Sequence, residues 1–318
     1  MCRTYGLDVA RHLEIKRQLD DDDVAAVAHL LHVAEHADGH PAIDEHRWLD
    51  MAEGGRSSFA GLVAWEPGHD HPVAYAQVSR GKAHSWALDL AIDPHHRYDA
   101  RAIAPELLHA ALDLIGEEGG GHVHLWVHQP TTTHDEIAAS VGLHRGRDLL
   151  QLRLPLPVDL PVPELETRPF VVGVDEAAWL DVNNRAFEWH PEQGAWTREE
   201  LDARELEPWF DPDGFLLHEI DGRLAGFCWT KVHAGHEEHG HDPPLGEIYV
   251  IAVDPDHHGR GLGRALVLLG LDHLAQQGLR WGMLYVDAAN EPAVKLYEHL
   301  GFRLNHVDRA YTGDVAPR

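Results

Sequence analysis

The sequence predicts an α/β protein made of two copies of one fold, each with a mixed, mostly antiparallel sheet flanked by helices. The first observation is a repeated Asp-Pro marker: residues 91–94 read Ala-Ile-Asp-Pro, and residues 252–255, 161 positions later, read Ala-Val-Asp-Pro. The second is Gly142-Leu143, which Gly301-Phe302 matches 159 positions later. Between these markers both halves read as strand, turn, long helix, strand, short helix and strand, which indicates an internal duplication.

A proline-rich segment predicts the boundary between the two copies. Pro155, Pro157, Pro161 and Pro163 remove backbone donors and favour an extended connector. We therefore expect a first domain over residues 1–154, a linker over 155–163 and a second domain over 164–318.

Each half opens with a helix-like segment, at residues 24–35 and at residues 175–188. Residues 246–253 then form a nearly continuous run rich in β-branched residues, which is typical of a strand buried on both faces. A second short strand is expected at residues 284–286.

The strand at 246–253 leads, through a glycine-rich turn, to an amphipathic helix. Leu262, Leu266, Leu269 and His273 are spaced three or four residues apart, which predicts the buried stripe of that helix. Gly278 is placed to end it.

Composition excludes several classes of partner. The 318 residues include 26 Lys and Arg against 53 Asp and Glu, a net charge of −27. A nucleic acid or an anionic membrane surface would require basic side chains, so neither is expected. With Cys2 and Cys228 as its only cysteines and no long apolar run, the chain is expected to be cytoplasmic and reduced, and we expect a monomer.

The strongest local signal is the glycine-rich segment at residues 258–264, between the expected strand and helix. Its three glycines allow backbone N–H groups to converge on one point, and the helix N-terminus and two arginines add positive charge. A Walker loop is excluded because Gly-Lys-Ser/Thr is absent, and the G-x-G-x-G spacing differs from that of a dinucleotide fold. A diphosphate fits this loop, and a glycine turn without a ligand is the alternative.

A second motif favours a bound diphosphate over a glycine turn without a ligand. His258-Gly-Arg-Gly-Leu-Gly263 resembles the pyrophosphate loop of the GCN5-related N-acetyltransferase (GNAT) family, with His258 in place of the usual Gln or Arg. Asn290, Ala293, Tyr297 and Gly301-Phe302 resemble the family's C-terminal signature. The resemblance implies two tandem GNAT-like domains and acetyl-CoA as co-substrate. The residues that it implies for acetyl-CoA binding are Ile251, Ala252, Val253, His258, Gly259, Arg260, Gly261, Leu262, Gly263, Arg264, Asn290, Glu291, Pro292, Ala293, Val294 and Lys295, with Leu90, Ala91 and Ile92 in the first domain.

Acetyl transfer to an amine needs a polarised carbonyl, a base and an acid. Backbone N–H groups of residues 251–253 are expected to polarise the carbonyl, provided that the strand separates from its neighbour as in the family. Glu247 is the expected general base, and a strand-end glutamate facing water is the alternative. Tyr297 is the expected general acid, and an aromatic that packs the last helix onto the sheet is the alternative.

Residues 190–194, 229–233 and 246–250 carry a closer resemblance, to tandem-domain members of the family that acetylate the cysteinyl amine of a cysteine–glucosamine–inositol conjugate. The substrate contacts that this resemblance implies are Glu45, Glu192, Lys231, Glu247 and Tyr285. Two alternatives stay open: an acetyltransferase for another amine, such as an aminoglycoside or a protein N-terminus, and a non-catalytic CoA-binding regulator.

The first domain is expected to be catalytically silent. When the Asp-Pro markers are aligned, Tyr98–Ala100 stand opposite Gly259–Gly261, and Ala138 stands opposite Tyr297. The histidine-rich segment 233–241 has no recognised ligand spacing, so we expect a polar insertion there and no metal.

Overall fold

The structure is a computed structural model, and it divides into two compact units. One contains residues 1–148 and 307–318, and the other residues 149–306. The residues that the structure describes are 11–43, 47–48, 50–51, 58–69, 71–81, 84–188, 194–235 and 243–318.

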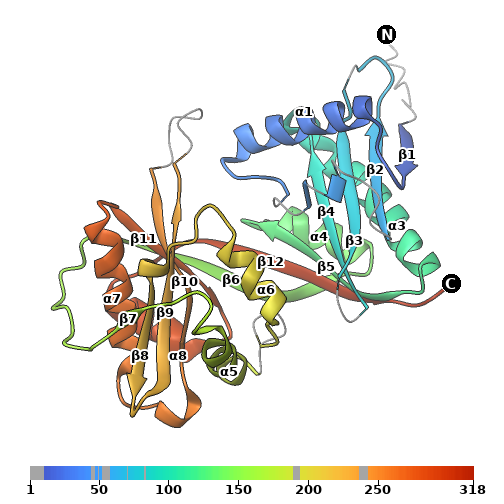
Figure 1. Ribbon diagram of the computed structural model, residues 1–318. Helices are drawn as coiled ribbons and strands as arrows, with labels where there is room; N and C mark the ends of the chain where they lie inside the picture. The colour runs from blue at the N-terminus through green and yellow to red at the C-terminus, as the bar shows by residue number, and fades with distance from the viewer. Residues whose placement is uncertain are drawn as a thin grey trace, which may run out of the picture. The chain divides into compact units, whose positions relative to one another are not determined.

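The first unit is a sheet with helices on both faces (Figure 1). Its strands, in spatial order, are β1 (His12–Lys16), β2 (Phe59–Trp65), β3 (Ala74–Arg80), β4 (Ser85–Ile92), β5 (Gly121–His128) and the C-terminal part of β12 (Arg303–Val315). Its helices are α1 (Asp21–Asp38), the 3₁₀ turn η1 (Pro94–Asp99), α3 (Ala100–Glu117) and α4 (Thr132–Ser140). Helix α1 packs on one face and α3 on the other.

The second unit repeats this plan. Its strands, in spatial order, are the C-terminal part of β6 (His144–Pro155), β11 (Trp281–Asp287), β10 (Leu245–Val253), β9 (Arg223–His233), β8 (Phe215–Ile220) and β7 (Arg168–Pro169). Its helices are α5 (Glu176–Ala186), α6 (Arg198–Glu205), α7 (Leu262–Gln276) and α8 (Glu291–Leu300), with 3₁₀ turns η2 (Pro212–Gly214) and η4 (Pro255–His257). Helices α7 and α8 pack on one face of the sheet, and α5 and α6 on the other.

The strand pairings confirm the predicted fold class. In the described residues of each unit one ladder is parallel, β4 with β5 and β10 with β11, and the other ladders are antiparallel. The Asp-Pro markers also have a common explanation. Asp93 and Asp254 each accept a hydrogen bond from the backbone N–H two residues later, and so each caps a 3₁₀ turn that begins at the following proline.

The compact units differ from the expected division at residues 154 and 164, because the last strand of each half pairs with the other unit's sheet. Residues 149–155 of β6 pair with β11 in the second unit, whereas residues 308–315 of β12 pair with β5 in the first. The proline-rich segment is also no free spacer. Leu156, Val158 and Leu160 are partly buried against the core of the second unit.

Most elements lie where the sequence predicts them, but the buried stripe of α7 is shifted. Leu262, Leu269 and His273 are only partly buried, whereas Val267, Gly270, Leu271 and Leu274 join Leu266 and Leu268 in the interior. Helix α7 packs against both β9 and β10, so a broader face is covered than the four predicted positions mark. In the described part of the chain, no helix combines the length and hydrophobicity needed to cross a bilayer.

Candidate active site

The candidate site begins at an opening in the second unit's sheet. Strand β10 pairs with β11 only at Gly246 and Glu247, although its ladder with β9 continues to Val253. A β-bulge at Tyr249, between the pairs of Ile248 and Val250 with β9, comes two residues after Glu247, the last residue paired with β11. Because a bulge bends its strand, it accounts for the separation of β10 from β11.

The separation leaves part of one β10 edge unpaired with β11. The N–H of Asp254 donates to the carbonyl of Ala225 in β9 at 2.9 Å. Since N–H directions alternate along a strand, those of Ile251 and Val253 point toward the open edge, whereas that of Ala252 points toward β9. Two of the three amides expected to serve the thioester are therefore directed toward the opening.

The glycine-rich loop follows this open edge and begins α7. Gly259 and Gly261 have φ values of +76° and +77°, a left-handed conformation that favours glycine. Gly261 is the N-cap of α7, and no side chain caps the helix. The first N–H groups of α7 therefore have no intrahelical partner and are available to an anion.

Gly263 has a different reason to be glycine. Its φ is not positive, and a Cβ there would meet only Val253 Cγ2, at 3.8 Å. A glycine within a helix costs about 0.5–1 kcal/mol relative to alanine, so the fold itself favours a larger residue. The close approach of a bound group supplies a reason for glycine at this position, and so the residues present fit a pyrophosphate.

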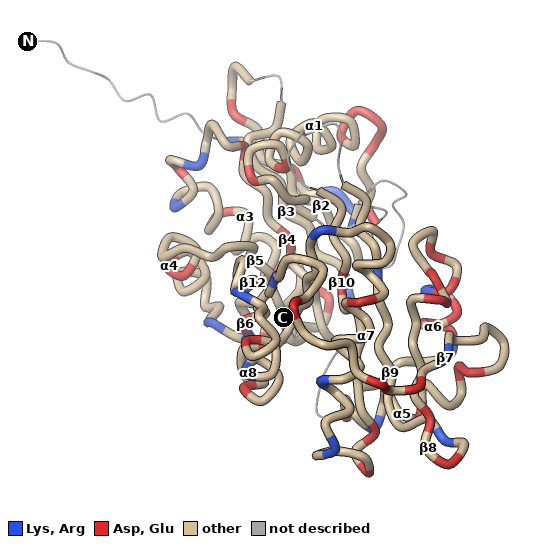
Figure 2. Tube along the Cα trace, turned by 90° about the vertical axis from the view of Figure 1, so that its left-hand side faces the viewer, with Lys and Arg blue, Asp and Glu red and all other residues tan. Residues whose placement is uncertain are grey.

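The two arginines of the loop are also available to bind an anion. Figure 2 shows acidic positions spread over many elements, yet within the described residues neither Arg260 nor Arg264 forms an ion pair with a carboxylate. Both guanidinium groups are exposed. His258, by contrast, is engaged by the chain itself, because its Nε2 lies 2.9 Å from the carbonyl oxygen of Val253. Its ring closes the loop onto the end of β10.

Glu247 lies in β10 and is only 6% exposed. Its Oε2 is 2.7 Å from Nε2 of His233, the last residue of β9. His233 is not among the site residues that the sequence predicts. The register that pairs Glu247 with Lys231 puts His233, two residues further on, on the same face of the sheet.

Two further expected substrate contacts share this face. Lys231 Nζ lies 4.4 Å from the ring centroid of Trp209 and 5.5 Å from that of Tyr249, so the ammonium group is held by aromatic faces. Tyr285 stands two residues beyond Met283, the register partner of Glu247. It is 39% exposed, and its hydroxyl accepts a hydrogen bond from Gln151 Nε2 at 2.8 Å.

Tyr297 lies on the opposite face, in the core beneath α8. It is 8% exposed and its ring meets that of Phe302 edge-on, with centroids 5.7 Å apart. Burial raises the pKa of its phenol, with a smaller contribution from the neighbouring Cys228 thiol. The side chain is thus protonated at neutral pH. Cys228 is fully buried, and burial raises its pKa to about 12, which does not suit a nucleophile.

The C-terminal signature has a clear structural basis. The Asn290 side chain caps α8 by accepting from the N–H of Ala293 at 3.3 Å. Gly301 ends the helix with φ +101°, and the N–H of Phe302 donates to the Tyr297 carbonyl. The other expected cofactor residues of this helix are Glu291 and Lys295, which form an exposed ion pair, Pro292 in the first turn and Val294.

The first unit has the opening without the loop. Leu90, Ala91 and Ile92 lie beyond Leu88, where the pairing of β4 with β5 ends. Strand β4 nevertheless pairs with β3 without a bulge, and η1 leads into α3 without a glycine. Arg97, in that turn, is neutralised by Asp38 through two hydrogen bonds of 2.5 and 2.7 Å.

Glu45, Glu192 and positions 236–241 of the histidine-rich segment lie outside the described residues.

Comparisons with known proteins agree with the fold. Residues 179–302 match the model of the acetyltransferase (GNAT) family. A GCN5-related N-acetyltransferase from Sphaerobacter thermophilus superposes with a TM-score of 0.73 at 22% identity, over 96% of both chains. A tandem GNAT protein from the clavulanic acid biosynthesis pathway superposes with a TM-score of 0.67 at 18% identity, over 96% of this chain and 100% of the other.

Sequence relatives are considerably more similar. Three proteins named mycothiol acetyltransferase align over most of their length. The one from Acidimicrobium ferrooxidans is 43% identical over 88% of this chain and 90% of its own. Those from Thermobispora bispora and Streptomyces coelicolor are 45% and 42% identical, over 91% and 95% of this chain and 95% of each relative.

Proposed function

This chain belongs to the mycothiol acetyltransferase family of GCN5-related N-acetyltransferases, and we propose that it transfers the acetyl group of acetyl-CoA to the cysteinyl amine of a cysteine–glucosamine–inositol conjugate. The observation that carries the proposal is the open edge of β10, which leads into a glycine loop. No side chain caps the helix N–H groups of this loop, and Arg260 and Arg264 form no ion pair with any described carboxylate. The relatives' name supports the choice of amine.

In this proposal the loop at residues 258–264 holds the diphosphate of the co-substrate. Amides of the first turn of α7 and the guanidinium groups of Arg260 and Arg264 stabilise its negative charge. Acetyl-CoA, when bound, supplies a thioester carbonyl, and the N–H groups of Ile251 and Val253 at the open edge are available to polarise it.

Glu247 takes the proton from the substrate amine. A carboxylate that is 6% exposed and held at 2.7 Å by His233 has a fixed orientation, which general-base catalysis requires. Lys231 and Tyr285 share its face of the sheet and are placed to contact the hydroxyl-rich part of the substrate.

Tyr297 acts on the leaving sulfur. Its raised pKa keeps the phenol protonated but makes it a weak acid, so it is better suited to donate a hydrogen bond to the developing thiolate than to lose its proton early. No covalent acyl-enzyme is needed, since the acetyl carbon passes from sulfur to nitrogen in one complex.

We assign catalysis to the second unit alone. In the described part of the first unit, β4 pairs with β3 without a bulge and η1 leads into α3 without a glycine. Ala138 stands where the second unit has Tyr297, and Arg97 is already paired with Asp38.

A thiol-release assay tests the proposal. Purified protein and acetyl-CoA should release thiol with the cysteine–glucosamine–inositol conjugate far faster than with cysteine, glucosamine or an aminoglycoside. Glu247→Gln and Tyr297→Phe should each lower kcat by about 100-fold or more, the usual contribution of an acid or base. Turnover only with another amine would indicate a different substrate. Acetyl-CoA binding without turnover of any amine would indicate a regulator.

A further inference from the structure

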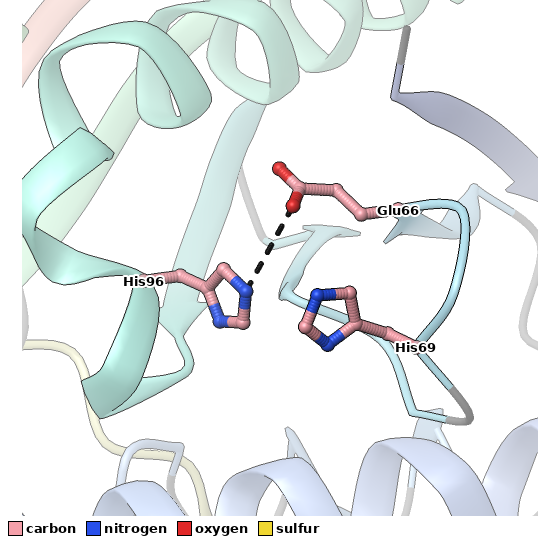
Figure 3. A group of neighbouring side chains, drawn as sticks. All are labelled: Glu66, His69 and His96. Carbon is pink, nitrogen blue, oxygen red and sulfur yellow. Dashed lines mark ion pairs between the residues drawn. The ribbon is translucent and has the colours of Figure 1, made fainter. Parts of the chain in front are cut away.

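We propose that the first unit carries a zinc site formed by Glu66, His69 and His96. One ligand atom from each of the three side chains lies within 4.8 Å of the other two. Figure 3 shows the two imidazole rings and the carboxylate converging on a common space. Two histidines and one carboxylate form a ligand set typical of zinc, with a fourth position left to water.

The three residues come from segments that are distant in the sequence. Glu66 directly follows β2, His69 lies in the turn before β3, and His96 lies in η1 before α3. The N–H of His69 donates to the carbonyl of Glu66 at 3.2 Å, which fixes the start of the turn. No short sequence motif joins these three residues, so nothing in the sequence predicts a metal here.

The buried state of His96 is independent evidence for a ligand. The residue is 6% exposed, and its Nδ1 is buried without a hydrogen-bond partner among the described residues. Its Nε2 is 3.8 Å from Glu66 Oε2 and its Nδ1 is 3.6 Å from Asp93 Oδ1, both beyond hydrogen-bond length. The buried nitrogen is Nδ1. A metal ion on Nε2 would fix the proton on Nδ1, where it is directed at the Asp93 carboxylate.

The surroundings provide the second shell that zinc sites use. A zinc-bound histidine directs its other nitrogen to a carboxylate, and Asp93, 3% exposed, lies on the Nδ1 side of His96. Asp93 is fixed by the N–H of His95 at 2.7 Å. Arg11 Nη1 lies 3.1 Å from Glu66 Oε1, which leaves Oε2 to face the imidazoles.

The geometry requires a small closure on binding. Zinc bonds of about 2.0–2.2 Å place tetrahedral ligand atoms roughly 3.3–3.6 Å apart. The His96–Glu66 distance of 3.8 Å is close to that value. His69 is exposed in its turn and makes the larger movement. Bound zinc would link this turn to η1, the first unit's counterpart of the turn before the glycine loop.

Zinc titration of the full-length protein, after chelator treatment, tests the proposal. The background variant combines His236→Ser, His239→Ser and His241→Ser, so that the histidine-rich segment does not compete. We expect one equivalent bound with submicromolar Kd, and an increase in Tm with zinc. Because ligand residues contribute at least as much as second-shell partners, His69→Ala and Glu66→Gln should each weaken binding by about 10- to 100-fold or more. His109→Ala, an exposed histidine of α3, is the matched control and should bind as the background does.

His69 is exposed, so its replacement should leave folding intact even if His96→Asn does not fold. Absence of tight zinc binding would overturn the proposal. Zinc binding that persists unchanged in both His69→Ala and Glu66→Gln would place the ion elsewhere and overturn it too. Acetyl transfer should be unaffected by chelator, so a failure here is separate from a failure of the proposed function.

Discussion

Replacing Gly263 by alanine should change stability and acetyl-CoA affinity in opposite directions. In the folded chain the added Cβ meets only Val253 Cγ2 at 3.8 Å. Alanine is favoured over glycine in a helix by about 0.5–1 kcal/mol, which for a unit of this size raises Tm by roughly 1–4 °C. The same methyl group separates the loop amides from the diphosphate. Loss of one hydrogen bond to a charged group costs about 1.5–3 kcal/mol, a roughly 10- to 150-fold weaker Kd.

Two other glycines, the N-cap Gly261 and Gly270 within α7, allow comparison, and Gly270 is the control for binding. Gly261 has φ +77°, so Gly261→Ala should destabilise the protein by about 1–2 kcal/mol. Gly270 lies against β9, where a Cβ would come 2.5 Å from Cys228 Sγ. Overpacking there should cost about 1–3 kcal/mol without changing the affinity for acetyl-CoA.

Thermal denaturation and calorimetric titration with acetyl-CoA measure both quantities on the same samples. The expected pattern is a more stable but weakly binding Gly263→Ala and a less stable but normally binding Gly270→Ala. If Gly263→Ala binds acetyl-CoA as tightly as the natural chain, the loop does not hold the diphosphate. If Gly263→Ala is less stable than the natural chain, the space for a Cβ at this position is smaller than the 3.8 Å contact indicates.

Three further predictions follow from single contacts. His233→Leu should lower kcat by about 10- to 100-fold, as expected for a misplaced base, whereas His233→Gln retains a donor for Glu247 and should keep most of the rate. Steady-state assays that give the two variants the same kcat would exclude a positioning role for His233. Asn290→Ala should destabilise the protein by about 1 kcal/mol through loss of the α8 cap, and Asn290→Ser should restore the cap. Urea denaturation measures both variants, and an alanine variant as stable as the natural chain would contradict this role of Asn290. Burial, with smaller contributions from Glu176 and Asp202, raises the pKa of Glu205 from 4.5 to about 7. The folded state therefore holds a proton that the unfolded state releases, and the protein loses stability as pH rises from about 4.5 to about 7. Glu205→Gln should raise Tm at about pH 8 and have little effect at about pH 4. The same gain in Tm at both pH values would contradict this prediction.

Much of the fold was predictable because its signals are local. The Asp-Pro pairs mark two 3₁₀ turns that their own aspartates cap, and Gly301 ends α8 through a left-handed conformation that a side chain would disfavour. The glycine loop was predictable for the same reason, since positive φ at Gly259 and Gly261 leaves a direct trace in the sequence.

The pairs that build the candidate site were harder to predict. The contact of His233 with Glu247 joins two strands across a loop, and the opening of β10 depends on a bulge at Tyr249 that no residue pattern marks. The cluster of Glu66 and His96 is likewise formed by separate elements.

The sequence alone determined that two similar α/β units exist, where their helices and strands run, and where the glycine loop lies, because backbone conformation and hydrophobic periodicity are properties of neighbouring residues. The tertiary structure decided which strand completes which sheet, which amides face the opening of β10, and which histidine holds the glutamate. Those features depend on register and on contacts between distant segments, and one residue of register reverses the face that a side chain occupies.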